Sequence, residues 1–245
     1  RDVAVTGVQT CALPISTPDT IVRAMVGREP PARVGKGSLG SLVSIGSRGS
    51  ENRVPRLSVR GLARAPRFRD ITFDVHAGEV VALFGLVGSG RTEVLEAIFG
   101  ITVPDRGEVA IDGQTVSIRS ARDAARAGLG FVPEERARQG LFFNLSLVPN
   151  IVLPKATRDG LRRLTHAADR AVAQAQVSSL GIKTASVDHT PDALSGGNQQ
   201  KVVAAKWLAT SPRVMLLDEP TKGVDVGARF ELHALIRAQV DAGMA

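Results

Sequence analysis

The sequence is poor in sulfur-containing and aromatic residues: its 245 residues include one cysteine, three methionines, one tryptophan and no tyrosine. A single cysteine excludes a disulfide framework and a zinc site built from several cysteines. The longest apolar run, residues 80–84, is far shorter than the roughly 18 residues that span a bilayer. Hydrophobic residues still make up 43% of the chain, which excludes a disordered, collagen-like or coiled-coil protein. We therefore predict a soluble globular chain.

Positive charge exceeds negative charge, with 31 Lys and Arg against 24 Asp and Glu and a formal net charge of +7. Clustered cations are typical of nucleic-acid binding. Here the arginines are scattered along the chain, and their densest group, residues 53–69, contains only Phe68 to stack on a base. The charge therefore indicates a solvated surface, and no nucleic-acid partner is expected.

The first 53 residues lack the pattern of a folded domain. Residues 5–15 read VTGVQTCALPI, which looks like the translation of a sequencing-library primer, so residues 1–16 are interpreted as an adapter artefact. Residues 17–53 combine a short helical pattern with five Gly and five Ser between positions 35 and 50, a composition typical of a flexible linker. A compact domain is predicted over residues 54–245.

Strand and helix patterns alternate in this domain, which predicts an α/β fold. Strands are predicted at 57–59, 71–75 and, as a buried strand, 79–84. A hairpin is predicted from 107–111 and 115–118, with its turn at Asp112-Gly113. Helices are predicted at 91–99, 121–127, 167–180, 199–209 and 228–240.

Residues 85–92, which follow the predicted buried strand, read GLVGSGRT and match the phosphate loop G-x-x-x-x-G-K-[ST]. Glycines let backbone N–H groups converge on phosphate oxygens, the following helix N-terminus adds positive potential, and the Thr92 hydroxyl can bind Mg²⁺. Arg91 stands where lysine is expected, and its forked guanidinium cannot replace a compact ammonium at the γ-phosphate. Taken alone, the motif also fits a glycine-rich turn. The predicted nucleotide-binding residues are Gly85, Gly88, Ser89, Gly90, Arg91 and Thr92.

A second motif, VMLLDE at residues 214–219, is an apolar strand that ends in two carboxylates. With a phosphate loop upstream, Asp218 is predicted to hold Mg²⁺ together with Thr92, and Glu219 to polarise the water that attacks the γ-phosphate. A buried strand with surface acids at its end is the alternative for this motif by itself.

Residues 194–201, LSGGNQQK, resemble the LSGGQ signature of the ATP-binding cassette family. The resemblance implies that this motif acts across a head-to-tail dimer, where Ser195, Gly196 and Gly197 meet the γ-phosphate held by the partner cassette. Residues 220–225, PTKGVD, resemble the D-loop of that family, which runs along the dimer interface.

The segments NQQK, GRTE and DEPTKGVDVGA are similar to the second cassette of bacterial tandem monosaccharide importers of the ribose, galactose and xylose type. Residues 21–28, IVRAMVGR, resemble the segment that closes the first cassette, so the resemblance implies that residues 17–53 are the end of the preceding cassette and the Gly/Ser linker. This resemblance implies an ABC-type P-loop NTPase cassette: a mixed or parallel sheet core, an antiparallel β subdomain and a helical subdomain at about 134–191, with the C-terminal part missing. The implied cofactors are ATP and Mg²⁺. The implied partners are the preceding cassette of the same chain, membrane permease subunits and, indirectly, a sugar-binding protein. The implied location is peripheral, at the cytoplasmic face of the inner membrane, and this fragment alone is expected to be an inactive ATPase.

Departures from the family pattern predict a degenerate site of its own. Glu134 stands where the family places its Q-loop glutamine, so we take it as a second catalytic candidate beside Glu219. Without tyrosine, Phe68 is the only, weak, candidate for stacking on adenine, and the switch histidine is expected beyond Ala245. The apolar residues Phe142, Phe143, Leu145, Leu147 and Val148 fit either a groove for the permease or the core of the helical subdomain.

Two other functions remain open at this point. One is a soluble tandem-cassette ATPase that acts on ribosomes, although Arg91 and the Gly/Ser linker argue against it. The other is a regulatory pseudo-ATPase cassette that only completes its partner's site, which partly merges with the importer hypothesis.

Overall fold

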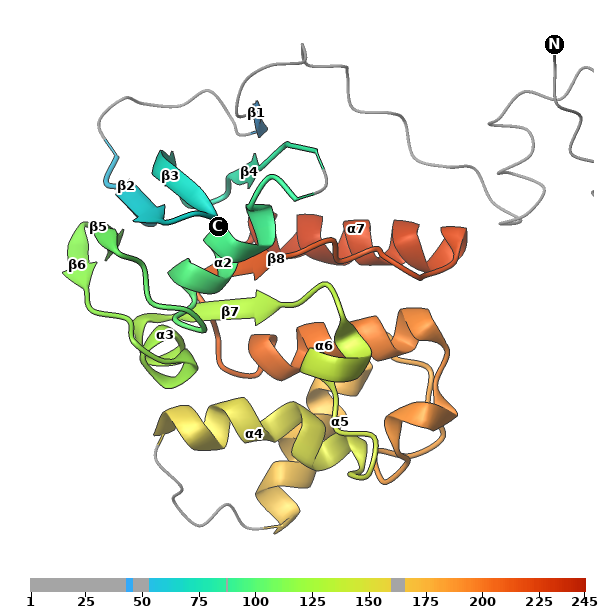
Figure 1. Cartoon of the computed structure of the whole chain (residues 1–245). Helices are drawn as coiled ribbons and strands as arrows, with labels where there is room; N and C mark the ends of the chain where they lie inside the picture. Colours follow the sequence, from blue (N-terminus) through green and yellow to red (C-terminus); the bar gives the residue numbers. More distant parts are fainter. Residues whose placement is uncertain (1–42, 46–52, 87, 160–165) are drawn as a thin grey trace, which may run out of the picture.

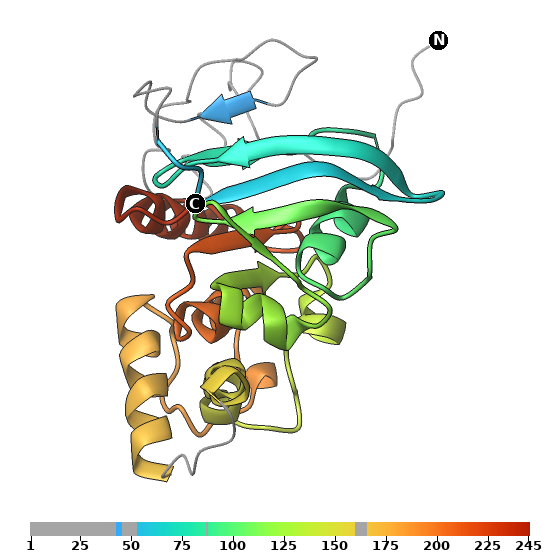
Figure 2. The same cartoon turned by 90° about the vertical axis from the view of Figure 1, so that its left-hand side faces the viewer.

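The computed structural model describes residues 43–45, 53–86, 88–159 and 166–245. Figures 1 and 2 show these residues as successive layers: an antiparallel sheet, then a layer with α2 and α7, a parallel strand pair, and a group of helices on the far side. None of the helices in the described ranges combines the length and hydrophobicity that a membrane crossing needs. The predicted adapter segment and most of the predicted linker lie outside the described residues.

The antiparallel sheet has the order β3-β2-β5-β6, from β3 (Phe68–Val75), β2 (Leu57–Arg64), β5 (Arg106–Ile111) and β6 (Gln114–Val116). The predicted hairpin is confirmed, because Ile111 pairs with Gln114 across a two-residue turn. Asp112 and Gly113 both have positive φ, 48° and 77°. That is the conformation of a type I′ turn, whose twist matches that of the flanking strands.

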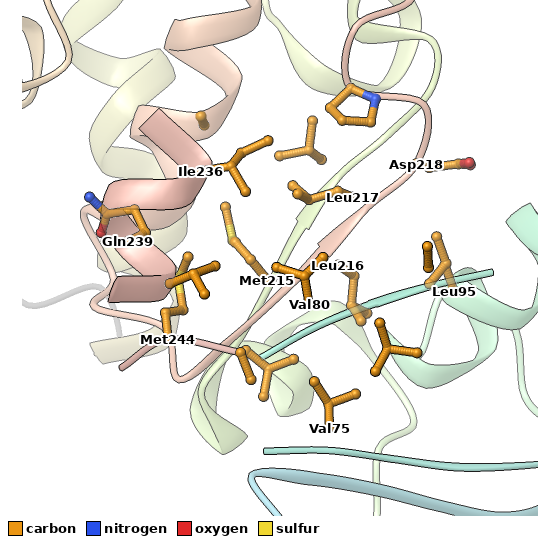
Figure 3. A pocket seen from close by; sticks show the side chains of 18 of the residues that line it. Val75, Val80, Leu95, Met215, Leu216, Leu217, Asp218, Ile236, Gln239 and Met244 are labelled. Atoms are coloured by element: carbon orange, nitrogen blue, oxygen red, sulfur yellow. The ribbon is translucent and has the colours of Figure 1, made fainter. Parts of the chain in front are cut away.

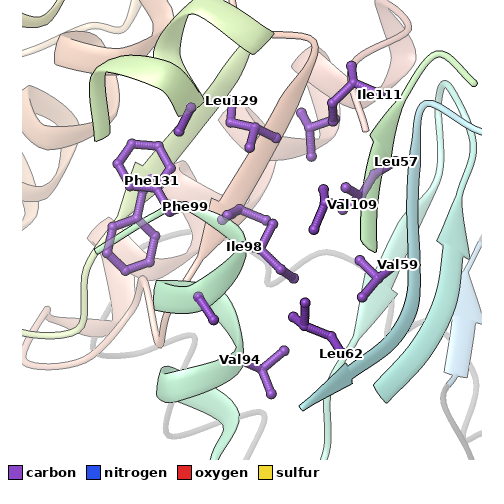
Figure 4. Close-up of a cluster of buried hydrophobic side chains, with 14 of the residues drawn as sticks. Leu57, Val59, Leu62, Val94, Ile98, Phe99, Val109, Ile111, Leu129 and Phe131 are labelled. Atoms are coloured by element: carbon purple, nitrogen blue, oxygen red, sulfur yellow. The ribbon is translucent and has the colours of Figure 1, made fainter. Parts of the chain in front are cut away.

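One hydrophobic core lies between this sheet and helix α2 (Arg91–Ile98), as Figure 4 shows. Leu57 and Val59 of β2 are at most 1% exposed, and Ile98 of α2 is fully buried against them. Phe99, at the end of α2, packs on Phe131 with 5.3 Å between ring centroids. These contacts hold the C-terminal end of α2 between the antiparallel sheet and β7. The predicted phosphate loop lies at the other end of this helix.

The parallel strands β7 (Leu129–Val132) and β8 (Val214–Leu217) form the centre of the molecule. All four residues of β7 are buried, which is typical of a parallel strand covered on both faces. The helices α3 (Ala121–Ala127) and α6 (Gly196–Leu208) contact β7, and α7 (Val226–Asp241) follows β8.

The far helices form a second core, with η1 (Arg136–Gly140), α4 (Leu147–Asp159), α5 (His166–Ser179) and η2 (Pro191–Ala193) packed on α6. The buried side chain of Asn150 ties the entry of α4 to the preceding loop. Its Oδ1 accepts from the Phe142 N–H at 2.8 Å, and its amide donates to the Phe142, Leu145 and Ser146 carbonyls. A polar group in this core is thereby fully bonded.

The strand before the phosphate loop differs from its prediction. β4 covers only Val80–Ala82, these residues are half-buried, and Phe84 is 77% exposed. Within the described residues, β4 pairs with β1 (Val43–Ile45), three residues of the predicted linker, and with no other strand. The prediction of a buried strand over 79–84 is therefore wrong in length and burial, because one edge of β4 faces a cavity.

That cavity, of about 440 Å³, separates β4 from β8 (Figure 3). Its walls are mainly apolar and include Val80, Leu216, Ile236 and Met244. Ala245 lies beside β8: its N–H donates to the Arg213 carbonyl at 3.0 Å, and its carbonyl accepts from the Met215 N–H at 2.8 Å. This is the hydrogen-bond pattern of a strand parallel to β8.

Candidate functional site

The predicted phosphate loop turns sharply from β4 into α2. The Ser89 N–H donates to the Leu86 carbonyl at 3.0 Å, and Gly90 starts α2 with φ 90°. Among the described residues no side chain caps α2, whereas Ser195 caps α6 and Asp225 caps α7. The first-turn N–H groups of α2 are therefore available to an anion, as a phosphate site requires.

Arg91, the first residue of α2, forms an ion pair with Glu219, with 3.2 Å between Nη2 and Oε1. Glu219 has φ 41°, a left-handed conformation that is unusual for a side chain of this kind. The fold thus holds the carboxylate predicted to polarise water against the cation of the phosphate loop. Backbone strain of this kind is common at functional sites.

Asp218, at the end of β8, is 5% exposed, and its Oδ2 has no hydrogen-bond partner within the described residues. Burial raises the pKa of this carboxyl, as do the charges of Glu134 and Glu219, whereas a hydrogen bond from the Thr92 hydroxyl and the charge of Arg91 lower it. A buried carboxylate oxygen without a partner, beside a hydroxyl, fits the oxygen ligands that Mg²⁺ prefers. The residues predicted to hold the metal, Thr92 and Asp218, are brought together as expected.

Glu134, in the loop after β7, pairs with Lys222 in the predicted D-loop. Its charge also raises the pKa of Asp218, so Glu134 lies in the same group of carboxylates as Glu219. The sequence pattern did not indicate a role for Lys222. The structure therefore places Glu134 at the site, but engaged with a cation of its own chain.

The predicted signature motif forms the N-terminus of α6. Ser195 is exposed, and its hydroxyl accepts from the Asn198 N–H and from the Asn198 side-chain amide, the latter at 2.9 Å. Gly197 is buried, and a Cβ there would lie 2.3 Å from the Ala228 Cβ at the start of α7. The absence of a side chain at Gly197 therefore lets the N-termini of α6 and α7 pack closely. This packing role is additional to the predicted role of its backbone amide in phosphate binding.

Two predictions concern aromatic and apolar side chains, and burial bears on both. Phe68 is 6% exposed in the first core, although it also lines a cavity beside Gly90 and Arg91. Of the apolar stretch, Leu147 and Val148 are core residues, whereas Phe142 and Leu145 are 44% and 38% exposed. Part of the stretch therefore belongs to the second core, and a permease contact of the exposed part stays a prediction.

Residues 68–222, which include most of the features above, match the family model described as ABC transporter. The chain belongs to the ABC transporter family. Its P-loop NTPase fold, with an antiparallel sheet and a helical part, is that of an ABC cassette. Membership of this family of ATPases accounts for the combination of phosphate loop, acidic strand and signature motif in one chain.

Curated relatives of this cassette include ribose import ATP-binding proteins. The protein from Agrobacterium fabrum is 42% identical over 246 aligned positions, which cover 100% of this chain and 46% of the relative. That from Geobacillus kaustophilus is 43% identical, with 93% and 44% covered. The chain therefore spans less than half the length of these relatives.

Solved structures share the fold at lower identity. The dimeric cassette MJ0796 in a post-hydrolysis state, bound to ADP and Pi, has a TM-score of 0.63 and 23% identity, over 76% of this chain and 84% of that one. The CbiO1 protein from Clostridium perfringens has a TM-score of 0.62 and 23% identity, over 77% and 74%.

Two lysines to which the sequence pattern assigned no role, Lys201 and Lys206, hold α6 in place in this cassette. Because α6 begins at the signature motif, we call it the signature helix. Lys201 donates to the Gly181 carbonyl at 3.1 Å and pairs with Glu231 of α7 at 2.8 Å. Lys206 donates to the Gly140 carbonyl, and its Nζ lies 5.3 Å from the centre of the Phe142 ring. Buried lysines are hard to recognise from sequence, because lysines usually lie on the surface.

Burial lowers the pKa of Lys206 to about 8, from an ordinary 10.5. Between those two pH values the unfolded chain binds more protons than the folded one, so this lysine makes the cassette more stable as the pH rises. We expect the free energy of unfolding to increase by up to about 3 kcal/mol between pH 7.5 and 10 relative to Lys206→Met. Urea unfolding at several pH values measures it.

Lys183→Met provides the control, because Lys183 is exposed. Its curve should run parallel to that of the unsubstituted cassette. A Lys206→Met curve that is also parallel to that of the unsubstituted cassette would show that the buried ammonium carries no such cost.

Proposed function

We propose that this cassette is the second nucleotide-binding half of a tandem ATP-binding subunit of a bacterial monosaccharide importer. The subunit would lie at the cytoplasmic face of the inner membrane, bound to permease subunits that receive sugar from a binding protein. The names of the relatives, ribose import ATP-binding proteins, and their twofold greater length support this proposal.

The observation that carries the proposal is that the elements for two different nucleotides are present in one cassette. The uncapped start of α2 and the unpartnered Asp218 Oδ2 would form one anion and metal site, whereas the exposed Ser195 caps a separate helix whose N-terminus would receive a second phosphate. In a head-to-tail pair, that second phosphate is the γ-phosphate on the preceding cassette.

At the cassette's own site, the N–H groups at the start of α2 would bind the β- and γ-phosphates of ATP, and Thr92 and Asp218 would hold Mg²⁺. A bound Mg²⁺ supplies positive charge to the phosphate oxygens as negative charge develops. Glu219 would accept a hydrogen bond from the attacking water and orient it. Glu134 would contact the same water network in place of the usual glutamine.

We propose further that this own site is degenerate. Arg91 is held by Glu219 at 3.2 Å, and Glu134 by Lys222, so both predicted catalytic carboxylates are neutralised by cations of the same chain. A carboxylate engaged with a guanidinium is a weaker acceptor for a water proton. This observation also favours the second candidate function, a regulatory pseudo-ATPase cassette that mainly completes its partner's site.

The exposed Phe142 and Leu145, near the N-terminus of α4, are the apolar surface that we assign to the permease. They flank the segment after Glu134, so a permease element seated there would contact the loop that carries a carboxylate of the nucleotide site. Burial of large apolar side chains would supply the binding energy.

Degeneracy predicts unequal effects of two matched substitutions in the full two-cassette protein with its permease. Arg91→Ala should lower ribose uptake by less than about 10-fold, because this site contributes little hydrolysis. Replacing the corresponding phosphate-loop cation of the preceding cassette should lower it by about 100-fold or more. Uptake of radiolabelled ribose and release of phosphate measure both.

Arg91→Lys is the informative control, since it restores the compact ammonium of an ordinary phosphate loop. Equal losses from Arg91→Ala and from the substitution in the preceding cassette would contradict the degenerate site. Uptake of ribose, galactose and xylose that does not depend on this subunit at all would contradict the proposed function.

A further inference from the structure

Arg136, the first residue of η1, joins three segments that are distant in sequence. Its Nε donates to the Gln199 side-chain oxygen at 3.3 Å, its Nη1 to the Lys222 carbonyl at 3.0 Å and its Nη2 to the Gly223 carbonyl at 3.2 Å. One guanidinium therefore connects the loop after β7, the first turns of α6 and the loop after Glu219. A planar fork can hold such an arrangement, whereas a lysine ammonium cannot.

Two glycines make room for this guanidinium. A Cβ at Gly196 would lie 2.8 Å from the Arg136 Nη2, and one at Gly223 would lie 3.3 Å from the Arg136 Nη1. Gly223 also has φ 66°, which favours glycine by itself. A larger residue in place of Gly196 of the signature motif would thus collide with Arg136 of the same chain. This constraint is separate from any contact across a dimer.

The side chain of Gln199 links Arg136 by hydrogen bonds to the segment that precedes Ser195. While its side-chain oxygen accepts from Arg136, its amide nitrogen donates to the Pro191 carbonyl at 3.0 Å and to the Leu194 carbonyl at 3.2 Å. The ion pair between Glu134 and Lys222 also joins the loop after β7 to the loop after Glu219. The direction of the first turn of α6 therefore depends on a continuous set of hydrogen bonds that starts at Arg136.

We propose that Arg136 is a positioning residue that fixes the signature helix relative to the loop after Glu219. The inference rests on the proposed function, in which the N-terminus of α6 meets a phosphate of the partner cassette. Without Arg136, Ser195 and the Gly196 amide would keep their chemistry but lose their fixed direction. Misplacement by about 1 Å typically costs about 100-fold in rate, while the binding of ATP to the open site is unaffected.

The test compares Arg136→Ala with Arg138→Ala in the full two-cassette protein bound to its permease. Arg138 lies on the same element, but its side chain is 82% exposed and pairs only with Glu135 among the interactions that the structure describes. We expect Arg136→Ala to lower kcat for ATP by about 100-fold and to change KM little. Arg138→Ala should leave both near their starting values.

Chemical rescue distinguishes positioning from general stability. Guanidinium chloride at tens of millimolar should restore part of the lost turnover of Arg136→Ala, because the planar cation can occupy the space between Gly196 and Gly223, whereas methylammonium should not. If Arg136→Ala does not fold, Arg136→Lys takes its place: a loss in kcat without a rise in KM supports the proposal.

Unchanged kcat, an equal loss in Arg138→Ala, or a loss that guanidinium fails to restore in a folded Arg136→Ala protein would overturn the inference. A rise in KM equal to the fall in kcat for Arg136→Lys would do the same. Ser195→Arg separates this inference from the proposed function. If Ser195→Arg abolishes turnover and Arg136→Ala does not, only the inference fails, whereas normal turnover in Ser195→Arg contradicts the proposed function itself.

Discussion

Ser195→Arg is expected to abolish most ATP turnover and sugar uptake of the full two-cassette protein, while ATP still binds to the open preceding cassette. The substitution removes the hydroxyl at the N-terminus of α6 and adds bulk and a misplaced cation at an exposed position. Loss of one preorganised donor to a transferring phosphate costs about 2.7–4 kcal/mol of barrier, or 100- to 1000-fold in rate. Turnover and nucleotide affinity are measured on one preparation.

Ser178→Arg is the matched control, because it places the same charge at an exposed serine of α5. It should leave turnover unchanged. Ser195→Ala separates loss of the hydroxyl from the added bulk, and should lie between the two. Near-normal turnover in Ser195→Arg would leave the signature motif with a structural role only.

Gly90→Ala is expected to have the second large effect, on both stability and nucleotide binding. Gly90 has φ 90°, and a Cβ there would lie 2.7 Å from the Arg67 carbonyl oxygen. The left-handed conformation costs an alanine about 1–2 kcal/mol, and the collision adds about 1–3 kcal/mol. Because the backbone of the phosphate loop has to move, the affinity for ATP should fall by about 100-fold.

Gly88→Ala isolates the conformational part of this effect. Gly88 has φ 81°, but a Cβ there would have no neighbour within 4 Å among the residues that the structure describes. It should lower the free energy of unfolding by only about 1–2 kcal/mol. Thermal or urea unfolding of the cassette, with titration of a fluorescent ATP analogue, compares the two. Equal losses would show that the approach of Arg67 to the loop does not matter.

The sequence predicted those elements whose local pattern agrees with their surroundings. The hairpin at Asp112-Gly113 and the helices that begin near residues 91, 121, 166, 196 and 226 are found close to their predicted bounds. α4 was not predicted, and Pro154 in its interior argues against a helix. The buried, fully bonded Asn150 and the second core stabilise it nonetheless. Tertiary packing overrides local propensity there.

The residues of the candidate site that could be predicted are those that stand in a short sequence motif. Glycines, Thr92 and Asp218 stand in motifs whose spacing itself indicates phosphate and metal binding. Two cations were missed: Lys222, which pairs with Glu134, and Arg136, which donates to the Gln199 side chain and to two backbone carbonyls. Their partners lie 63 to 88 residues away in sequence, and no local pattern indicates such a pairing. Only the fold brings them together.

The cavity between β4 and β8 also bears on how the site can move. Arg91 begins α2, which follows β4 and the phosphate loop, whereas Asp218 and Glu219 directly follow β8; all three line this cavity. The width of the cavity between β4 and β8 therefore bears on the distance between the charges of Arg91 and Glu219. A segment that enters it as a strand parallel to β8, as the hydrogen bonds of Ala245 begin to do, would fix that separation along its whole length. Filling this space would therefore restrain the relative movement of Arg91 and Glu219, which an exposed ion pair alone holds only weakly.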